Sequence, residues 1–317
     1  MILDCALDAL KDGALSIPIL FIAYYLMELL ERSKRLDESV LHAYSAKAGP
    51  AIGGLLGVVP QCGISGAAAT LFSTGAITVG TMLAVFFATS DEMLPIMLSS
   101  VRETNGLGLG RILGIVAAKA GFGIVLGYLA DLLFGRFFAR KDIHSFCERE
   151  HCECEEEEGS ALHAALIHTL KIAGMLIVVT FLLNLILANV EPEKLSGTIL
   201  AQPVLGAMLL ALLGLIPNCS VSVILTRAFL SGIIGLGGLF AGLLSNAGIG
   251  MLVLFRSNRD MRENFAVVGI SYVFSALSGI LIGLLTECME DRREDGGPPC
   301  FWEKPERIPL NPARNMV

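Results

Sequence analysis

The chain contains an internal repeat with an offset of 157 residues. When residues 49–102 are laid on residues 206–259 without a gap, fourteen of the 54 positions are identical. The clearest match pairs PQCGIS at 60–65 with PNCSVS at 217–222. Repeated apolar segments that Gly and Pro interrupt at corresponding places are typical of secondary transporters whose binding site lies between the two halves.

The composition indicates a membrane protein. The chain is 54% hydrophobic and only 17% charged, and its mean hydropathy is +0.69. Apolar windows close to or above the roughly 18 to 20 residues that cross a bilayer recur along it. They lie at about 13–30, 76–98, 111–135, 164–187, 233–255 and 264–286. A soluble protein would need one very large core to bury so many long windows.

Two further apolar segments, 47–75 and 204–232, are each interrupted near the middle by a proline, Pro60 or Pro217. Each half is too short to cross a bilayer comfortably. A proline in a helix leaves the carbonyl four residues earlier without its partner. Here those carbonyls belong to Leu56 and Leu213. Because loose backbone at membrane depth must be buried in protein or face a cavity, we expect two helical hairpins whose tips meet near the midplane.

These segments predict an all-α polytopic membrane protein with about ten membrane helices in total. It would consist of two inverted-topology repeats, each with full-length spans and one Pro-broken helical hairpin, because each repeat crosses the membrane an odd number of times. The predicted division is a first transmembrane repeat (1–135), a Cys/His/Glu-rich linker (136–162), a second transmembrane repeat (163–290) and a polar tail (291–317).

Basic residues concentrate in three short loops, whereas loops 99–110 and 188–203 hold one basic residue each. The three groups are Arg32, Lys34 and Arg35, then Arg136, Arg140 and Lys141, then Arg256, Arg259 and Arg262. Short loops rich in Lys and Arg tend to stay in the cytoplasm. This pattern predicts a multi-pass protein of the cell (inner) membrane with a cytoplasmic linker and both termini external.

Two adjacent acids lie inside an apolar window in the motif Ser90-Asp91-Glu92. Ionisable groups at such depth are candidates for function. Pro95 leaves the carbonyl of Asp91 without its helical partner, so this residue offers a cation both a carboxylate and a carbonyl oxygen. We therefore predict that these three residues belong to an ion-binding site.

At the corresponding place, the second repeat has the neutral motif Ser245-Asn246-Ala247-Gly248. A site with one charged and one neutral side suits a divalent cation. The hairpin tips are expected to supply further ligands: Gln61, Cys62 and Ser65 from one repeat, and Asn218, Cys219 and Ser222 from the other. The alternative is that the two cysteines are small packing residues and that the serines bond within their own helices.

Lys119 lies within a third apolar window. It could pair with Asp91 or Glu92 when no substrate is bound, and so act as a proton-coupled counter-ion. Two alternatives remain open, namely that it snorkels to the membrane surface or forms a structural bridge with Asp131.

The linker contains Cys147, His151, Cys152 and Cys154 among a run of glutamates. Thiolate and imidazole suit zinc or copper(I), and carboxylates suit manganese or magnesium. The spacing matches no closed zinc module. Metal capture and an acidic linker with incidental cysteines are therefore both open, and a reducing cytoplasm would keep these cysteines as thiols.

Taken together, the two V/I-P-x-C-x-x-S motifs with their following G-x-I-x-x-G, the S-D-E and S-N-A-G motifs and the linker resemble the ten-helix heavy-metal exporters. Members of that family are described variously as manganese transporters and as arsenic efflux proteins. The chain is also similar to the organoarsenical permeases, whose P-x-C-S-C-G motif is richer in thiols. The resemblance covers about residues 6–290 and implies export. The single cysteine in each repeat favours an oxygen-rich cation site.

Three functions follow. The first is a divalent-metal exporter with Asp91 and Glu92 as charged ligands, and the second is a metalloid or organoarsenical permease with Cys62 and Cys219 as ligands. The third is a membrane-embedded redox or metal-dependent enzyme, for which the sequence offers no nucleophile, base and orienting group. We expect a small inorganic ion as substrate, with no cofactor and no nucleic-acid partner. The protein would lie in the lipid bilayer, and whether it forms a homo-oligomer stays open.

Overall fold

The computed structural model describes residues 38–59, 62–89, 93–103, 108–138 and 202–294, and isolated positions within 18–25 and 166–178. In these parts every regular element is a helix. The helices are α2 (Glu38–Gly57), α3 (Cys62–Ser73), α4 (Val79–Ala88), α5 (Met93–Glu103), α6 (Leu109–Phe134), α9 (Pro203–Gly214), α10 (Cys219–Leu230), α11 (Leu236–Ser245), α12 (Gly250–Ser257) and α13 (Met261–Glu294).

Four helical segments are long and apolar enough to cross a membrane. They are Val79–Leu98, Leu109–Phe134, Leu236–Ser257 and Met261–Thr286, and they overlap four of the six predicted windows. The chain is therefore a helical protein that crosses the membrane several times. The predicted windows at 13–30 and 164–187 lie outside the described residues, apart from isolated positions.

Both proline-containing segments are interrupted, as predicted. In the first, α2 ends at Gly57 and α3 begins at Cys62, and in the second, α9 ends at Gly214 and α10 begins at Cys219. The helices Gly63–Ser73, Val204–Gly214 and Ser220–Leu230 are apolar but short.

The predicted loss of hydrogen bonding before the prolines is wrong. The Leu56 carbonyl accepts a hydrogen bond from the Val59 amide at 3.2 Å, and the Leu213 carbonyl accepts one from the Ile216 amide at 3.1 Å. Each helix tightens its last turn, so that amides bond three residues back and pair the carbonyls that a proline would leave open.

The two halves form the same turns at the same offset. α3 and α10 are each followed by a glycine with positive φ, 81° at Gly75 and 74° at Gly232. After each glycine, the next amide bonds the carbonyl five residues back, the 6→1 bond of a Schellman motif. These bonds run from Ala76 to Leu71 (3.0 Å) and from Ile233 to Ala228 (2.9 Å).

A close helix crossing is also repeated. A Cβ atom on Gly57 of α2 would come within 2.8 Å of the Val85 carbonyl oxygen on α4. A Cβ atom on Gly214 of α9 would overlap the carbonyl oxygen of Gly242 and the hydroxyl of Ser245 on α11. Only glycine lets the backbones approach this closely, so the helix before each proline packs tightly against the last turn of α4 or α11.

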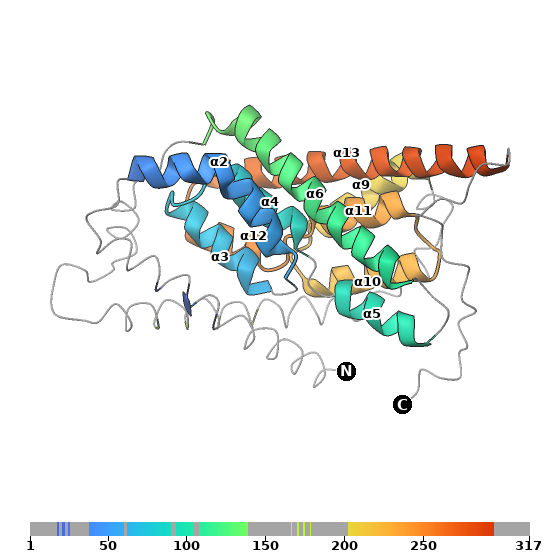
Figure 1. Cartoon of the computed structure of the whole chain (residues 1–317). Helices are drawn as coiled ribbons and strands as arrows, with labels where there is room; N and C mark the ends of the chain where they lie inside the picture. Colours follow the sequence, from blue (N-terminus) through green and yellow to red (C-terminus); the bar gives the residue numbers. More distant parts are fainter. Residues whose placement is uncertain are drawn as a thin grey trace, which may run out of the picture.

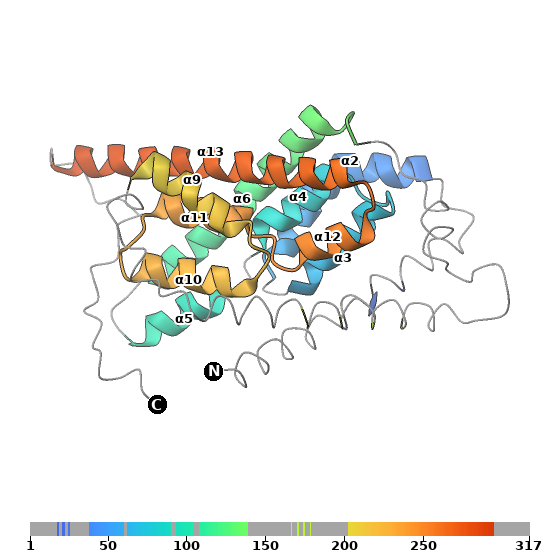
Figure 2. The ribbon, with the colours of Figure 1, turned by 180° about the vertical axis from the view of Figure 1, so that it is seen from behind.

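Long helices frame the structure, with α13 running along one side and α6 crossing it (Figure 1). Helix α4 packs against α2 and α6, and α11 packs against α9 and α13. Between the halves, α3 lies beside α12, and α10 lies beside α5 (Figure 2).

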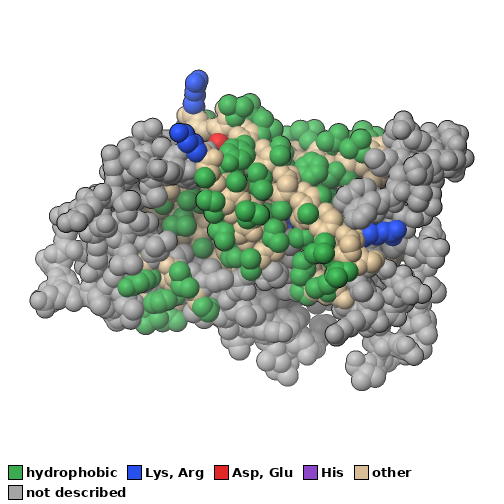
Figure 3. Space-filling model, in the orientation of Figure 1, with side chains coloured by type: hydrophobic (Ala, Val, Ile, Leu, Met, Phe, Trp, Pro, Cys, Tyr) green, Lys and Arg blue, Asp and Glu red, His purple; other side chains and the backbone are tan. Residues whose placement is uncertain are grey.

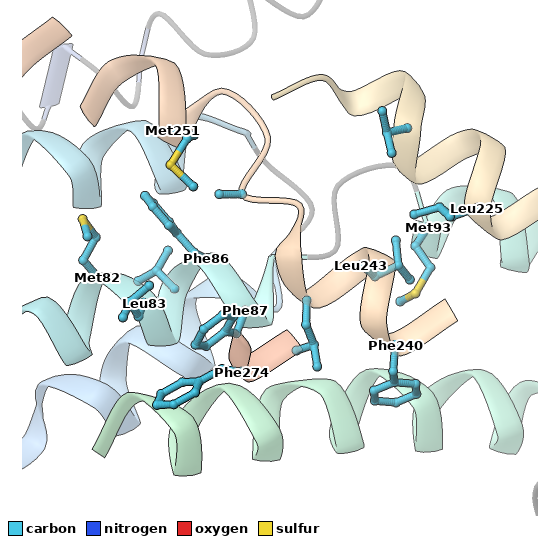
Figure 4. Packing of buried hydrophobic residues seen from close by; sticks show 14 of the residues in the cluster. Met82, Leu83, Phe86, Phe87, Met93, Leu225, Phe240, Leu243, Met251 and Phe274 are labelled. Carbon is cyan, nitrogen blue, oxygen red and sulfur yellow. The ribbon is translucent and has the colours of Figure 1, made fainter. Parts of the chain in front are cut away.

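The interior between these helices is apolar. Phe87 of α4 lies next to Phe274 of α13, with ring centroids 6.3 Å apart (Figure 4). Met93 of α5 and Leu225 of α10 belong to the same buried cluster. Hydrophobic side chains also cover much of the described outer surface in one view, with basic side chains at its edges (Figure 3). Leu132 on α6, for example, is 79% exposed. An apolar surface of this kind is what lipid requires of a membrane protein.

Candidate ion-binding site

The first break in a candidate span follows α4. Thr89 caps this helix and returns both its amide and its hydroxyl to the Val85 carbonyl, at 2.9 and 2.7 Å. Its own carbonyl accepts a hydrogen bond from the ammonium of Lys119, which belongs to α6 and is 1% exposed. In the sequence, Ser90 and the acidic residues Asp91 and Glu92 follow immediately after this point.

Helix α6 also holds the opposite end of α4. The Asp131 carboxylate accepts hydrogen bonds from the Gly80 amide and the Thr78 hydroxyl, both at 2.7 Å. The negative Asp131 carboxylate thus lies at the N-terminus of α4, and the positive Lys119 ammonium lies at its C-terminus. Each charge complements the partial charge of that helix end.

This arrangement removes two of the three interpretations of Lys119. Asp131 lies twelve residues further along α6, about 18 Å away along the helix axis, so the predicted Lys119–Asp131 bridge is wrong. Snorkelling is wrong as well, because the side chain is buried. Pairing with Asp91 or Glu92 stays a prediction, since both acids lie outside the described residues.

The second break follows α11 and is held by a neutral side chain. The Asn246 amide nitrogen donates to the Ser222 hydroxyl at 2.8 Å and to the Asn218 carbonyl at 3.3 Å. The Asn246 amide oxygen accepts from the Gly248 amide at 2.9 Å. Asn246, Asn218 and Ser222 are all buried, so the structure brings three predicted ligands from the second half together.

The side chains of Asn218 and Ser245 make further hydrogen bonds within the second half. The Asn218 side-chain oxygen accepts from the Ser220 amide at 2.9 Å and so caps α10. The Ser245 hydroxyl bonds carbonyls of its own helix, those of Ala241 and Gly242, at 3.1 and 3.0 Å. Ser245 thus bonds within its own helix, and the Asn246 amide oxygen keeps one lone pair for another donor or for a cation.

The tip of the first hairpin touches the second half directly. Ser65 on α3 is fully buried. A Cβ atom on Gly250, the first residue of α12, would lie 2.8 Å from the Ser65 Cβ and 2.7 Å from the Phe86 ring. The start of α12 is thereby packed into the first half.

Several predicted ligands fall outside the structure's description. Cys62 and Cys219 are the first residues of α3 and α10, but their side chains are not described. The remaining predicted residues outside the described ranges are Gln61, Ser90, Asp91, Glu92, Cys147, His151, Cys152 and Cys154. Among the side chains that the structure does describe, no three His, Cys, Asp or Glu residues gather as a metal site.

Sequence reasoning missed that two predicted spans are discontinuous. The window 76–98 consists of α4 and α5, and the window 233–255 consists of α11 and α12. Pro95 and the glycines of the second motif were the available signals. No pattern pointed to the Thr89 carbonyl, because any residue can contribute a backbone oxygen.

A family model described as "Putative, 10TM heavy-metal exporter" matches residues 2–195. The matched segment contains the first hairpin, the S-D-E motif and the linker, and it ends before the second hairpin. No curated protein and no solved structure matches the chain.

Proposed function

Because the chain belongs to this family of ten-helix heavy-metal exporters, we propose that it exports a divalent metal ion, manganese or another heavy metal. The site would lie near the membrane midplane between two inverted-topology repeats. The observation that carries this proposal is the pair of broken helices at equivalent positions, where the chain presents buried polar groups inside an apolar interior. Discontinuous helices at the interface of repeats are a usual basis of ion sites in transporters.

The proposed topology has ten membrane helices, with the linker in the cytoplasm and both termini outside the cell membrane. The three basic loops support this orientation. A reporter fused after Lys141 should be cytoplasmic, and one fused after Lys194 should be external. If both fusions report the same side, the repeats do not have inverted topology.

In this site the first half supplies the charge. Asp91 and Glu92 would be the charged ligands, with Ser90, Gln61 and Ser65 as polar neighbours. Asn246, Asn218 and Ser222 would form the neutral side of the site, and their mutual hydrogen bonds favour a preformed arrangement over three independent ligands.

Lys119 would act as the coupling residue. Its ammonium lies at the end of α4, where a bound cation would experience electrostatic repulsion from it. When the metal is released, Lys119 would return to its contact with the Thr89 carbonyl, so that the two events alternate in the transport cycle. The proposed export needs no cofactor, and the metal is its substrate.

An alternative substrate is arsenite or an organoarsenical, bound by Cys62 and Cys219. The observation in its favour is that each cysteine is the first residue of a helix at the equivalent hairpin break. The acids would then carry protons. An enzymatic function is less consistent with a family of exporters.

Substitution of the acid and of the cysteine separates these proposals. Asp91→Asn keeps the shape but removes a charge, which at an effective dielectric of about 20 contributes roughly 4 kcal/mol per unit of partner charge at about 4 Å. Even if desolvation and screening leave only about 2 kcal/mol, Mn²⁺ affinity should fall more than tenfold. Cys62→Ser should retain Mn²⁺ transport.

The test measures metal binding by purified protein and efflux from cells that lack their own exporters, with manganese, zinc, cobalt, arsenite and a methylated arsenical. Unchanged Mn²⁺ binding in Asp91→Asn, with loss of activity in Cys62→Ser, would replace the metal exporter by the metalloid permease. Deletion of the linker, 147–158, should alter metal capture but leave transport working, because the proposed site lies between the repeats.

A further inference from the structure

Two serines on α13 are buried without the hydrogen bonds that burial demands. Ser271 and Ser275 are both 0% exposed, and across the described residues neither hydroxyl has a hydrogen-bond partner. Most buried polar groups are paired with protein or with ordered water, and an exception calls for an explanation. The requirement is stricter in a membrane, where lipid offers no partner.

Other buried hydroxyls in this protein pair with their own helix. Ser73, Thr226 and Ser245 each donate to the carbonyl four residues earlier, at 2.8, 2.7 and 3.1 Å. On α13 itself, Thr286 does the same with Ile282 at 3.0 Å. This common solution is not used at Ser271 and Ser275, which leaves their hydroxyls available to another ligand.

The two serines lie on the same inward face of α13. They are four residues apart, which places them one above the other, about 6 Å apart along the helix. The outward face carries Val273, Leu277 and Leu281, which are 47%, 59% and 51% exposed. At about 100° per residue, Ser271 and Ser275 point away from this lipid-facing stripe and into the protein.

Their neighbours on α13 show which surfaces they lie between. On one side, Phe274 contacts Phe87 of α4, with ring centroids 6.3 Å apart (Figure 4). Phe274 also contacts Phe134 of α6 at a centroid distance of 6.3 Å. On the other side, Ala276 packs with alanines of α9 and α11. The hydroxyls therefore lie at the seam where α13 of the second half meets the first half.

This seam leads to the candidate site. Phe87 is two residues before Thr89, at the end of α4 where the Lys119 contact lies. Phe274, which neighbours Ser275 on α13, thus connects this seam to the last turn of α4. A hydroxyl both donates and accepts hydrogen bonds, so the two serines can bind water molecules or the hydration shell of a cation, and they add no charge.

We propose that Ser271 and Ser275 line a water-containing route between the two halves, along which the hydrated cation approaches or leaves the site at the end of α4. This inference rests on the proposed export of a divalent metal and adds the path to it. Buried water with two or more polar partners is a normal structural component, and a partly hydrated path lowers the cost of moving a divalent ion through an apolar interior.

Cysteine labelling tests the route. Ser271→Cys and Ser275→Cys should react with a small, charged, water-soluble thiol reagent in membranes opened so that both faces are accessible. The reacting species is the thiolate, which needs water, so both positions should react about tenfold or more faster than a thiol in a dry interior. Tandem mass spectrometry assigns the label to each position and separates it from the native cysteines.

Two matched controls lie on the same helix. Ala276→Cys is buried against α9 and α11, and Val273→Cys faces the lipid. Both should stay unlabelled, because neither position meets water. Equal labelling at 275 and 276, or no labelling at 271 and 275, would overturn the inference.

Mn²⁺ then tests whether the cargo uses this route. At saturating concentration Mn²⁺ should slow labelling at 271 and 275 several-fold. Direct binding of Mn²⁺ to the introduced thiols contributes little to this effect, because Mn²⁺ prefers oxygen ligands. Labelling that Mn²⁺ leaves unchanged overturns the assignment to the transport route. The exporter proposal survives that outcome if Asp91→Asn still weakens Mn²⁺ binding.

Removal of the hydroxyls gives a second readout. The double variant Ser271→Ala/Ser275→Ala should reduce Mn²⁺ efflux several-fold while the amount of folded protein is unchanged or higher, because two unpaired polar groups are gone. Thr286→Val is the control, since it removes a hydroxyl that is satisfied within the same helix, and it should transport normally. Full efflux by the double variant would contradict the proposal.

Discussion

At the end of α4, the charged side chain of Lys119 on α6 donates to the carbonyl of Thr89, the residue that caps the helix. At the end of α11, a neutral amide reaches back to the hairpin tip of its own half and bonds Asn218 and Ser222. The position that corresponds to Lys119 at the 157-residue offset is Ala276. The two halves thus share their turns and their close helix crossings but differ in charge. The two halves therefore share one backbone scaffold. A few side chains that differ between them give the two helix breaks different roles.

The largest effect should follow from removing the charge that distinguishes the halves. We expect Lys119→Met to bind Mn²⁺ at least tenfold more tightly and to lose efflux, because a unit charge about 8 Å from the ion contributes roughly 2 kcal/mol per unit of partner charge at an effective dielectric of about 20. Equilibrium binding and vesicle efflux measure the two quantities. Weaker Mn²⁺ binding would mean that Lys119 supports the site and does not compete with the ion.

The next effect concerns the crossing that the halves share. Gly214→Ala should lower stability by about 1–3 kcal/mol, since the added methyl would overlap Ser245 and the Gly242 carbonyl. Gly57→Ala should cost less, because its nearest atoms are 2.7 and 2.8 Å away. Denaturation of the purified variants compares the two. Gly108→Ala, where a Cβ atom would meet nothing within 4 Å, provides a control, and a larger loss for Gly57→Ala would reverse the expected order.

A smaller change should follow from removing the neutral amide. Asn246→Ala takes away one uncharged ligand and its hydrogen bonds to Asn218 and Ser222, which corresponds to about 1 kcal/mol and to a roughly fivefold loss of Mn²⁺ affinity. The loss should be smaller than that in Asp91→Asn. If Asn246→Ala is the more damaging of the two, the charge difference between the halves is not what governs ion binding.

The smallest effects should be equal in the two halves. Gly75→Ala and Gly232→Ala place a side chain on a residue with positive φ, which costs about 1 kcal/mol at each position. Thermal unfolding should show similar shifts for both. A large difference between them would indicate that one turn has acquired a further role.

Much of the fold could be predicted because membrane insertion leaves a strong signal. The spans around α6 and α13, and both hairpin breaks, followed from apolar length and from the position of proline. The same reasoning failed at the carbonyls of Leu56 and Leu213, because it assumed that a helix keeps its regular bonding up to the proline. In the structure the last turn tightens and recovers the bonds.

The candidate site was less accessible to prediction. Polar residues inside apolar windows identified Asn218, Ser222 and Asn246, and the structure brings these three together. The partner of Lys119 could not be predicted, because a backbone carbonyl has no sequence signature and because Asp131 appeared equally suitable. Whether Lys119 meets Asp131 or the Thr89 carbonyl depends on where α4 begins and ends along α6, and the packing of the helices determines this.

The two contacts between α6 and α4 have a mechanical consequence. Asp131 holds one end of α4 through Gly80 and Thr78, and Lys119 holds the other end through Thr89. A slide of α4 along α6 would break both contacts at once, so the two helices are expected to move together as one rigid unit. Motion during a transport cycle must then be absorbed elsewhere. The points available include the contacts between α3 and α12, between α5 and α10, and between the α4–α6 pair and α11, where the two halves meet.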